Sequence, residues 1–251
     1  MSIHDSTPRH LPGDIAVVVP TYNVGDRLAA VLDNLLAVVS TVIVVDDGST
    51  DGSAGAAQDR PVGLITFDKN RGKGHALVAG YKKALEDSGV RCVAVVDADG
   101  QHDPAELPHL YDAMKARNAD FVIGARQFSG GHVPLRSRFG NVLTISLSAV
   151  LLGTRVRDTQ SGYRILSRRF LEAVLPGVRG GRYETEMELL GKAIGGGFKV
   201  VSVPIQTIYE EGNVSSHFHK IRDSYLIYRT LFATAWKARI RKARPTTPTN
   251  E

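Results

Sequence analysis

The stretch that decides the fold is Val93-Ala-Val-Val-Asp97-Ala-Asp99-Gly-Gln101-His-Asp103-Pro104. Its four leading apolar residues predict a buried strand, which ends in two carboxylates and is followed by Gly100 and the start of a helix. Residues i and i+2 point to the same side of an extended segment. Asp97 and Asp99, with the amide oxygen of Gln101 one step further, can therefore face one small volume.

Two carboxylates placed in this way favour a hard divalent cation. Mg²⁺ and Mn²⁺ are commonly held through one or two carboxylates, with the phosphates of a substrate completing the shell. The alternative is a solvated acidic turn that caps the next helix. Asp103 fits that alternative, because residues 103–106 combine an N-cap, a proline at the first helical position and a capping-box glutamate. Asp97 and Asp99 fit the cation better, because two like charges after a buried strand are costly without one.

Further apolar runs occur on both sides of this stretch, and those on its amino-terminal side end in polar clusters. Buried strands are predicted at 15–19, 42–45, 64–67 and 120–124, and the polar clusters lie at 20–23, 46–51 and 70–74. Between these strands, apolar residues recur at helical spacing. We therefore predict an α/β fold with a mostly parallel sheet covered on both faces. Ligands bind such sheets outside the carboxyl ends of the strands, which places all the polar clusters on one rim.

The second half of the chain is less regular and rich in arginine. Arginines beside a metal site would hold phosphate groups in bidentate fashion, and the alternative is that most are solvated surface residues. Those around the apolar stretch 142–152 are Arg126, Arg136, Arg138, Arg155, Arg157 and Arg164. Glu184 and Glu186 begin a predicted helix, where they would serve either as a catalytic base or as favourable charges at the helix start. A late strand is predicted at 198–204.

Length and cysteine content point to one domain in a reducing compartment. The chain has 251 residues and a single cysteine, Cys92, inside an apolar run, so no disulfide framework exists and we expect a cytoplasmic protein. Residues 1–12 contain no apolar signal segment, and no apolar run approaches the roughly 20 residues that span a bilayer. We expect a disordered tail at 1–13, a catalytic domain at 14–212, a basic helical segment at 213–244 and a tail at 245–251.

Positive charge gathers near the carboxyl terminus. Residues 220–244 hold eight basic side chains and one acid, Asp223, a net charge of +7 in a chain whose total is +5. From Phe218 onward apolar residues recur three or four apart, with Trp236 beside them, which predicts an amphipathic helix. Contact with an anionic membrane surface, with nucleic acid or simply with the protein core would each explain it.

Five motifs together resemble a known family. Residues 20–23, 45–49, 70–74, 97–102 and 158–164 follow the order found in family 2 glycosyltransferases, and the chain is most similar to the dolichyl-phosphate mannose synthase group. The resemblance implies a GT-A fold, a nucleotide-diphosphate sugar donor and inverting transfer of a hexose, mannose or glucose, to a polyprenyl or dolichyl phosphate. It also implies Mg²⁺ or Mn²⁺. Membrane attachment would be peripheral, through the basic helix or a membrane partner protein.

The resemblance assigns roles to single residues. Pro20, Tyr22 and Asp47 would contact the nucleoside, and Lys73 the anionic part of the nucleotide. Asp99 and Gln101 would bind the metal, with Asp97 beside them and close to the nucleotide. Arg126 and one of Arg136 or Arg138 would hold the acceptor phosphate, which makes Asp97, Asp99 and Arg126 the expected catalytic residues. The chain departs from the group at Val24, where glutamate is common, and this leaves the donor base open.

The acceptor determines whether a base is needed. A phosphate monoester is largely ionised at neutral pH, so positioning by arginine suffices. A hydroxyl acceptor would need a base, for which Glu184, Glu186 and Asp158 are the candidates. Other readings are transfer to a lipid hydroxyl or glycan and a non-catalytic nucleotide-sugar-binding module. We do not expect nucleic acid as a partner, and its binding would show a steep dependence on salt.

Overall fold

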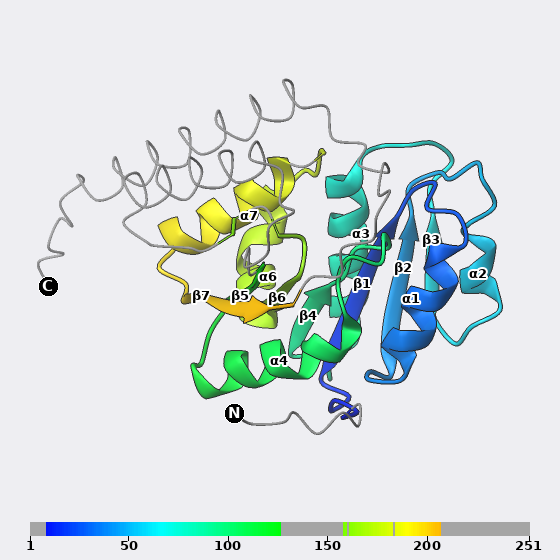
Figure 1. Cartoon of the computed structure of the whole chain (residues 1–251). Helices are drawn as coiled ribbons and strands as arrows, with labels where there is room; N and C mark the ends of the chain where they lie inside the picture. The colour runs from blue at the N-terminus through cyan, green and yellow to red at the C-terminus, as the bar shows by residue number, and fades with distance from the viewer. Residues whose placement is uncertain (1–8, 127–157, 160, 183, 207–251) are drawn as a thin grey trace, which may run out of the picture.

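A computed structural model describes residues 9–126, 158–159, 161–182 and 184–206 (Figure 1). Arg136, Arg138, the apolar stretch 142–152 and the basic segment 213–244 lie outside these residues. No helix within the described ranges is long and apolar enough to cross a membrane.

Seven strands form one sheet in the order β3-β2-β1-β4-β6-β5-β7. The strands are β1 (Ile15–Thr21), β2 (Thr41–Asp46), β3 (Gly63–Thr66), β4 (Cys92–Val95), β5 (Phe121–Arg126), β6 (Arg164–Ser167) and β7 (Val200–Ile205). Neighbouring strands run parallel except at β6, which is antiparallel to both β4 and β5. The predicted mostly parallel sheet is confirmed.

Helices cover both faces of this sheet (Figure 1). They are α1 (Arg27–Leu36), α2 (Gly55–Gln58), α3 (Lys73–Leu85), α4 (Leu107–Ala116), α6 (Arg168–Val174) and α7 (Glu184–Gly195), with short 3-10 turns η1 (Pro104–Glu106) and η2 (Leu175–Gly177). Apolar residues of α1 and α4 share one buried cluster with one face of the sheet. Those of α3, α6 and α7 share a second cluster with the other face.

Side-chain alternation along β1 shows how the sequence builds these two cores. Val17 and Val19 belong to the cluster with α1 and α4, whereas Ala16 and Val18 belong to the cluster with α3. This is the period of two that an extended strand imposes. At Gly80 of α3 a Cβ would overlap the Val18 side chain. The helix therefore packs against β1 at a distance that only glycine permits.

β1 marks the place where the strand order reverses. β2 pairs with one of its edges and β4 with the other. Helix α1 then leaves on one face and α3 arrives on the opposite face. In open α/β sheets this arrangement opens a crevice at the carboxyl ends of the two central strands. Tyr22 follows β1 there, and Asp97 and Asp99 follow β4.

Two sequence expectations need correction. Asp103 caps η1, since its side chain accepts a hydrogen bond from Ala105 N. Glu106 does not complete a capping box, because its Oε1 accepts instead from Gln206 N at 3.3 Å, at the end of β7. Strand β6 and helix α6 occupy a region that the sequence led us to treat as irregular. Strand β6 has only four residues and begins with an arginine, so it carries almost no apolar signal.

Candidate active site

The loops after β1 and β2 are joined into one framework at the rim of the sheet. Asn23 N donates to Ser49 Oγ at 3.0 Å, and Thr50 N donates to Asn23 Oδ1 at 2.8 Å. Gly25 N donates to Asp51 Oδ2 at 2.9 Å. Each loop therefore supplies donors and acceptors to the other. Of the predicted nucleoside residues, Pro20 lies within β1 and Tyr22 directly follows it.

Asp47 organises the glycine-rich loop before α3. Its Oδ1 accepts from Arg71 N at 2.7 Å and its Oδ2 from Gly72 N at 2.8 Å. Burial raises the pKa of the Asp47 carboxyl, while these two amides oppose that shift. Gly72 has φ of +107°, which L side chains rarely adopt. In this structure both oxygens of Asp47 hold the loop, so its effect on a nucleoside would come largely through loop shape.

Lys73, the first residue of α3, links three elements of the site. Its Nζ lies 2.7 Å from Asp97 Oδ1, after β4, and 3.4 Å from Glu186 Oε1, in α7. The lysine and aspartate side chains are 18% and 23% exposed, so the pair is partly shielded from water. Asp97 Oδ1 is in ion-pair contact here, without the alignment of a hydrogen bond.

Asp97 and Asp99 differ in their electrostatic surroundings. Burial opposes the charge of Asp97, yet Lys73, His102 and Arg164 together hold its pKa below the usual value. For Asp99, burial and then the nearby Asp97 raise the pKa. Asp99 Oδ1 accepts a backbone hydrogen bond from Gln101 N at 3.0 Å. Burial and a neighbouring like charge both disfavour the charged form of this carboxylate, and a bound cation would offset both effects.

The donor set suits a divalent cation shared with a substrate. In the part of the chain that the structure describes, no three His, Cys, Asp or Glu side chains are grouped to hold a metal alone. Two carboxylates two positions apart, next to Gln101, match the sites that keep several positions for water or phosphate. The residues present therefore fit Mg²⁺ or Mn²⁺.

His102 and Tyr163 support the Asp97 backbone, a role that the sequence did not suggest. Asp97 N donates to His102 Nδ1 at 3.4 Å. The imidazole stacks on the Tyr163 ring with centroids 5.0 Å apart, and Tyr163 OH donates to Asp103 O at 3.2 Å. Burial lowers the pKa of His102, which keeps Nδ1 available as an acceptor. Both rings therefore help to fix the start of the acidic loop.

The segment 158–164 packs directly on Asp97. A Cβ at Gly162 would overlap the Asp97 carboxylate, so any larger residue at that position would have to displace this carboxylate. Arg164, 3% exposed, donates to Ser161 O at 2.8 Å and Thr159 O at 2.9 Å within the segment, and to Glu186 O at 2.8 Å in α7. Backbone carbonyls take three of its N–H groups and the residue is buried, so Arg164 does not lie at the solvated surface, which was one of the two readings of these arginines.

Arg126, at the end of β5, is bound by Asp158. Its Nε donates to Asp158 Oδ2 at 2.6 Å and its Nη2 to Oδ1 at 2.9 Å. The backbone N of Arg126 also donates to Oδ2, at 3.1 Å. Asp158 is therefore fully engaged, which argues against its candidacy as a general base.

The comparisons with known proteins agree with this geometry. The sequence profile described as glycosyl transferase family 2 matches residues 16–175. The chain belongs to glycosyltransferase family 2. It is 35% identical over 211 residues to the polyprenol monophosphomannose synthase of Mycolicibacterium smegmatis, covering 79% of each chain. It is 29% identical over 240 residues to a UDP-N-acetylglucosamine--dolichyl-phosphate N-acetylglucosaminyltransferase of Methanococcus voltae, covering 86% of this chain and 94% of that one.

A solved structure shares the fold of this glycosyltransferase. Glucosyl-3-phosphoglycerate synthase from Mycobacterium tuberculosis, in complex with Mn²⁺, UDP and glucosyl-3-phosphoglycerate, superposes with a TM-score of 0.69 at 19% identity. The match covers 88% of this chain and 80% of that one. The GT-A fold implied by the motifs is thereby confirmed.

The predicted site residues of the transferase divide into three groups. Lys73, Asp97 and Glu186 are in contact. Asp99 follows β4 two positions after Asp97, and Arg126 is the last residue of β5. Pro20, Tyr22 and Asp47 lie on the β1 and β2 side of the rim. Arg136 and Arg138 lie outside the described residues.

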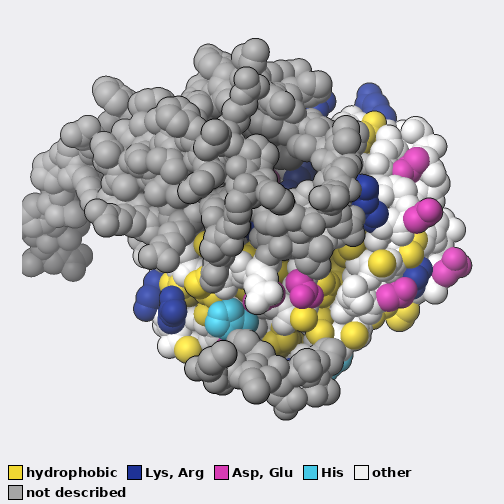
Figure 2. Space-filling view, viewed as in Figure 1, with side chains coloured by type: hydrophobic (Ala, Val, Ile, Leu, Met, Phe, Trp, Pro, Cys, Tyr) yellow, Lys and Arg dark blue, Asp and Glu magenta, His cyan; other side chains and the backbone are white. Residues whose placement is uncertain are grey.

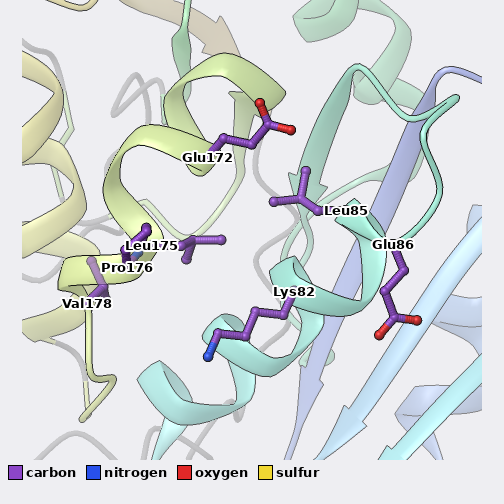
Figure 3. A pocket seen from close by; sticks show the side chains of 7 residues that line it. All are labelled: Lys82, Leu85, Glu86, Glu172, Leu175, Pro176 and Val178. Atoms are coloured by element: carbon purple, nitrogen blue, oxygen red, sulfur yellow. The ribbon is translucent and has the colours of Figure 1, made fainter.

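A cavity of about 480 Å³ lies elsewhere in the transferase (Figure 3). Its walls are Lys82, Leu85 and Glu86 of α3 and Glu172, Leu175, Pro176 and Val178 of the α6 region. Lys73 begins α3 and Leu85 ends it. At 1.5 Å per residue, the two ends of this helix are about 18 Å apart. The cavity is therefore separate from the polar rim and does not serve as the donor site.

Proposed function

We propose that this family 2 glycosyltransferase moves a hexose, mannose or glucose, from a nucleotide-diphosphate sugar to a polyprenyl or dolichyl phosphate with inversion. One observation carries the proposal: the acids that could activate a hydroxyl acceptor are largely engaged. Asp158 is bound to Arg126, and Glu186 faces Lys73. An acceptor that is already ionised needs no base, and a phosphate monoester meets that condition at neutral pH.

The donor side of the proposal rests on the residues after β1, β2 and β4. Asp99 and Gln101, with Asp97 beside them, would hold Mg²⁺ or Mn²⁺, which as a Lewis acid stabilises the charge of a departing diphosphate. Lys73 would place its ammonium near the same diphosphate. Pro20 and Tyr22 would contact the nucleoside. Asp47 would shape the loop that bounds the nucleotide, through the two amides that it holds.

The acceptor side rests on arginine. Arg126 is the last residue of β5, and Asp97 lies just after β4 at the same carboxyl edge of the sheet. The side chain of Arg126 is 24% exposed. A planar guanidinium binds phosphate through paired hydrogen bonds, which positions the attacking oxygen as well as binding it. Arg136 or Arg138 would supply a second contact. We take Arg126 as the acceptor-phosphate residue in the experiments below.

The names of the relatives support the proposed acceptor more strongly than the proposed sugar. Both names refer to a polyprenol or dolichyl acceptor, but one protein handles mannose and the other N-acetylglucosamine. A second candidate function is transfer to a hydroxyl of a lipid or glycan. Glu184 favours it, because its Oε2 is buried without a hydrogen-bond partner among the described residues. A non-catalytic nucleotide-sugar-binding module is the third.

We further propose that the enzyme is cytoplasmic and attaches peripherally to an anionic membrane, where a polyprenyl acceptor resides. Among the side chains coloured in Figure 2, basic and acidic groups are interspersed over the visible face. The described part of that face therefore lacks a broad cationic surface. Attachment would fall to the basic segment 213–244 or to a membrane partner protein.

Turnover with matched acceptors tests the function. Purified protein is incubated with Mn²⁺, a panel of nucleotide sugars and either a short polyprenyl phosphate or the corresponding polyprenol, and nucleotide diphosphate release is followed. We expect release with the phosphate and none with the alcohol. Release with the alcohol alone would support a hydroxyl acceptor. Metal-dependent donor binding without release for any acceptor would support the binding module.

A further inference from the structure

The backbone amide of Asp97 is held by a side chain, unlike the amide before it. Val96 N donates to Val18 O of β1 at 3.1 Å, which continues the pairing of β4 with β1. Asp97 N donates instead to His102 Nδ1, at 3.4 Å. At the point where the chain leaves the sheet, the position of Asp97 therefore depends on where the His102 ring lies.

The His102 ring is held in turn by Tyr163, in the segment before β6. The two rings stack with centroids 5.0 Å apart and an angle of 28° between their planes. Tyr163 OH also donates to the carbonyl of Asp103, the residue after His102, at 3.2 Å. Tyr163 is 0% exposed and His102 6%, and the close packing of an interior leaves such rings few other positions. Tyr163 therefore holds the acidic loop at two successive residues.

Tyr163 is itself tied to the sheet. Its carbonyl accepts from Gly124 N of β5 at 2.9 Å, and its amide donates to Ser161 Oγ at 3.3 Å. The next residue, Arg164, is paired with β4 on one side and with β5 on the other. The Tyr163 ring therefore projects from a backbone that two neighbouring strands fix, and it provides a fixed contact for the loop that follows β4.

Gly162, in the same segment, gives a second contact with Asp97. Val95 and Arg164 are register partners in β4 and β6, and two further steps along this antiparallel register bring Gly162 opposite Asp97. A Cβ at Gly162 would overlap the Asp97 carboxylate. This short segment therefore bounds the carboxylate directly and also holds the backbone of the same residue through the two stacked rings.

We propose that Tyr163 is a positioning residue for the cation site and acts through His102 on Asp97. It contacts neither the cation nor the donor, but fixes the backbone from which the Asp97 carboxylate faces the site that it shares with Asp99. The inference rests on the proposed function, because that function places Mg²⁺ or Mn²⁺ beside these two carboxylates. Loss of a group that orients metal ligands typically lowers metal affinity about 10- to 100-fold.

Replacement of Tyr163 tests the role of its ring. Binding of Mn²⁺ is measured by calorimetry with UDP present and, separately, with GDP present. We expect Tyr163→Leu to raise the Kd for Mn²⁺ at least about tenfold. Tyr163→Phe keeps the stacked ring and loses only the hydroxyl, so we expect a rise of about threefold or less.

Phe170→Leu is the matched control for the loss of a buried ring. Phe170 is 0% exposed in the cluster that contains α3, and its ring packs edge-on against Phe121 and Phe198 with centroids 5.5 and 5.1 Å away. Phe170→Leu and Tyr163→Leu each leave a cavity in the interior, so both should lower the melting temperature. Only Tyr163→Leu should change the Mn²⁺ affinity. An equal rise in Kd for Phe170→Leu would overturn the inference, by showing a general effect of lost packing.

Substitutions of His102 test the path from Tyr163 to Asp97. His102→Asn places a side-chain oxygen near the position of Nδ1 and can still accept from Asp97 N, whereas His102→Leu offers no acceptor. We expect the Kd for Mn²⁺ to be at least about threefold higher in His102→Leu than in His102→Asn. In the His102→Leu background, Tyr163→Leu should add less than about twofold, because residues that act as a unit are not additive. Equal Kd values for the two His102 variants, or full additivity, would overturn the inference.

Metal binding and turnover are measured separately, so the inference and the function on which it rests can fail independently. If the wild type binds no Mn²⁺ with either nucleotide, the metal-dependent function and the inference both fail. If the wild type binds Mn²⁺ but transfers no sugar to a polyprenyl phosphate, the proposed function fails and the Kd values of the variants still decide the inference. If the wild type transfers sugar and Tyr163→Leu binds Mn²⁺ as tightly as the wild type, the inference alone fails.

Discussion

The ammonium of Lys73 lies 2.7 Å from the Asp97 carboxylate, so the chain supplies its own cation to one of the two acids after β4. Within the described residues no basic side chain pairs with Asp99 in this way, and its pKa is raised by burial and by Asp97. The two acids therefore differ in their charge environment. Asp97 faces the ammonium of Lys73, whereas Asp99 forms no ion pair with any residue in the described ranges.

Asp99→Asn should abolish transfer and leave the metal-free fold at least as stable as the wild type. The raised folded-state pKa of Asp99 means that its stabilising contribution is full below the unfolded value of 3.8 and is lost as pH rises through the folded value. At pH 7 the charged carboxylate is thus unfavourable, and an amide removes that penalty. Thermal unfolding in EDTA tests the expected stability, and a turnover assay with saturating Mn²⁺ tests the expected loss of transfer. Retained turnover would remove Asp99 from the metal site.

Asp97→Asn should destabilise the metal-free protein. The lowered pKa of Asp97 gives the opposite sign: its contribution is present above the unfolded value of 3.8 and is lost as pH falls through the folded value. Loss of the carboxylate leaves Lys73 facing a neutral amide, which we expect to cost about 1–3 kcal/mol. Denaturant unfolding at pH 7 measures this cost, and a midpoint equal to that of the wild type would show that the ion pair is not stabilising.

Arg126→Lys should impair use of the acceptor more than use of the donor. Lysine keeps the positive charge but loses the planar fork that binds Asp158 and, in the proposed function, would bind a phosphate. We expect a higher KM for polyprenyl phosphate, with the donor KM little changed. Steady-state kinetics with each substrate varied in turn provide the measurement. A change confined to the donor would contradict the assignment of Arg126 to the acceptor.

Gly162→Ala should inactivate the enzyme through Asp97. A methyl group at residue 162 would overlap the Asp97 carboxylate and force it out of place. The matched control is Gly63→Ala in β3, where the added methyl would make an ordinary contact, 3.7 Å from Ile43. We expect a large loss of turnover for the first variant and little for the second. Activity of Gly162→Ala near the wild-type level would mean that Asp97 can move without consequence.

The segment 213–244 should bind anionic vesicles. Basic residues near an anionic leaflet contribute about 1 kcal/mol each, so three or four in contact would attach the protein reversibly, and salt would weaken the attachment. Flotation of the intact chain and of a chain truncated after Ser216 measures this. If the helix instead docks on the core, truncation would lower the melting temperature and the intact chain would stay unbound at low salt.

Much of the site follows from sequence because it depends on local periodicity. Alternation along β1 and the abrupt end of the β4 run place Asp97 and Asp99 correctly, and Lys73 begins its helix as expected. Long-range pairing is different. Nothing local in the sequence indicates that Asp158 binds Arg126, 32 positions earlier, or that Arg164 is buried among carbonyls. Such pairs form only because β6 inserts between β4 and β5, and its own sequence signal is weak.

The reversed direction of β6 has a consequence for how the carboxyl edge of the sheet is held together. Because β6 is antiparallel, it begins at the edge where β5 ends, and Arg126 and Asp158 bind each other at that edge. The pair therefore fastens the end of β5 to the segment that leads into β6, so that side chains close this strand pair in addition to its backbone hydrogen bonds.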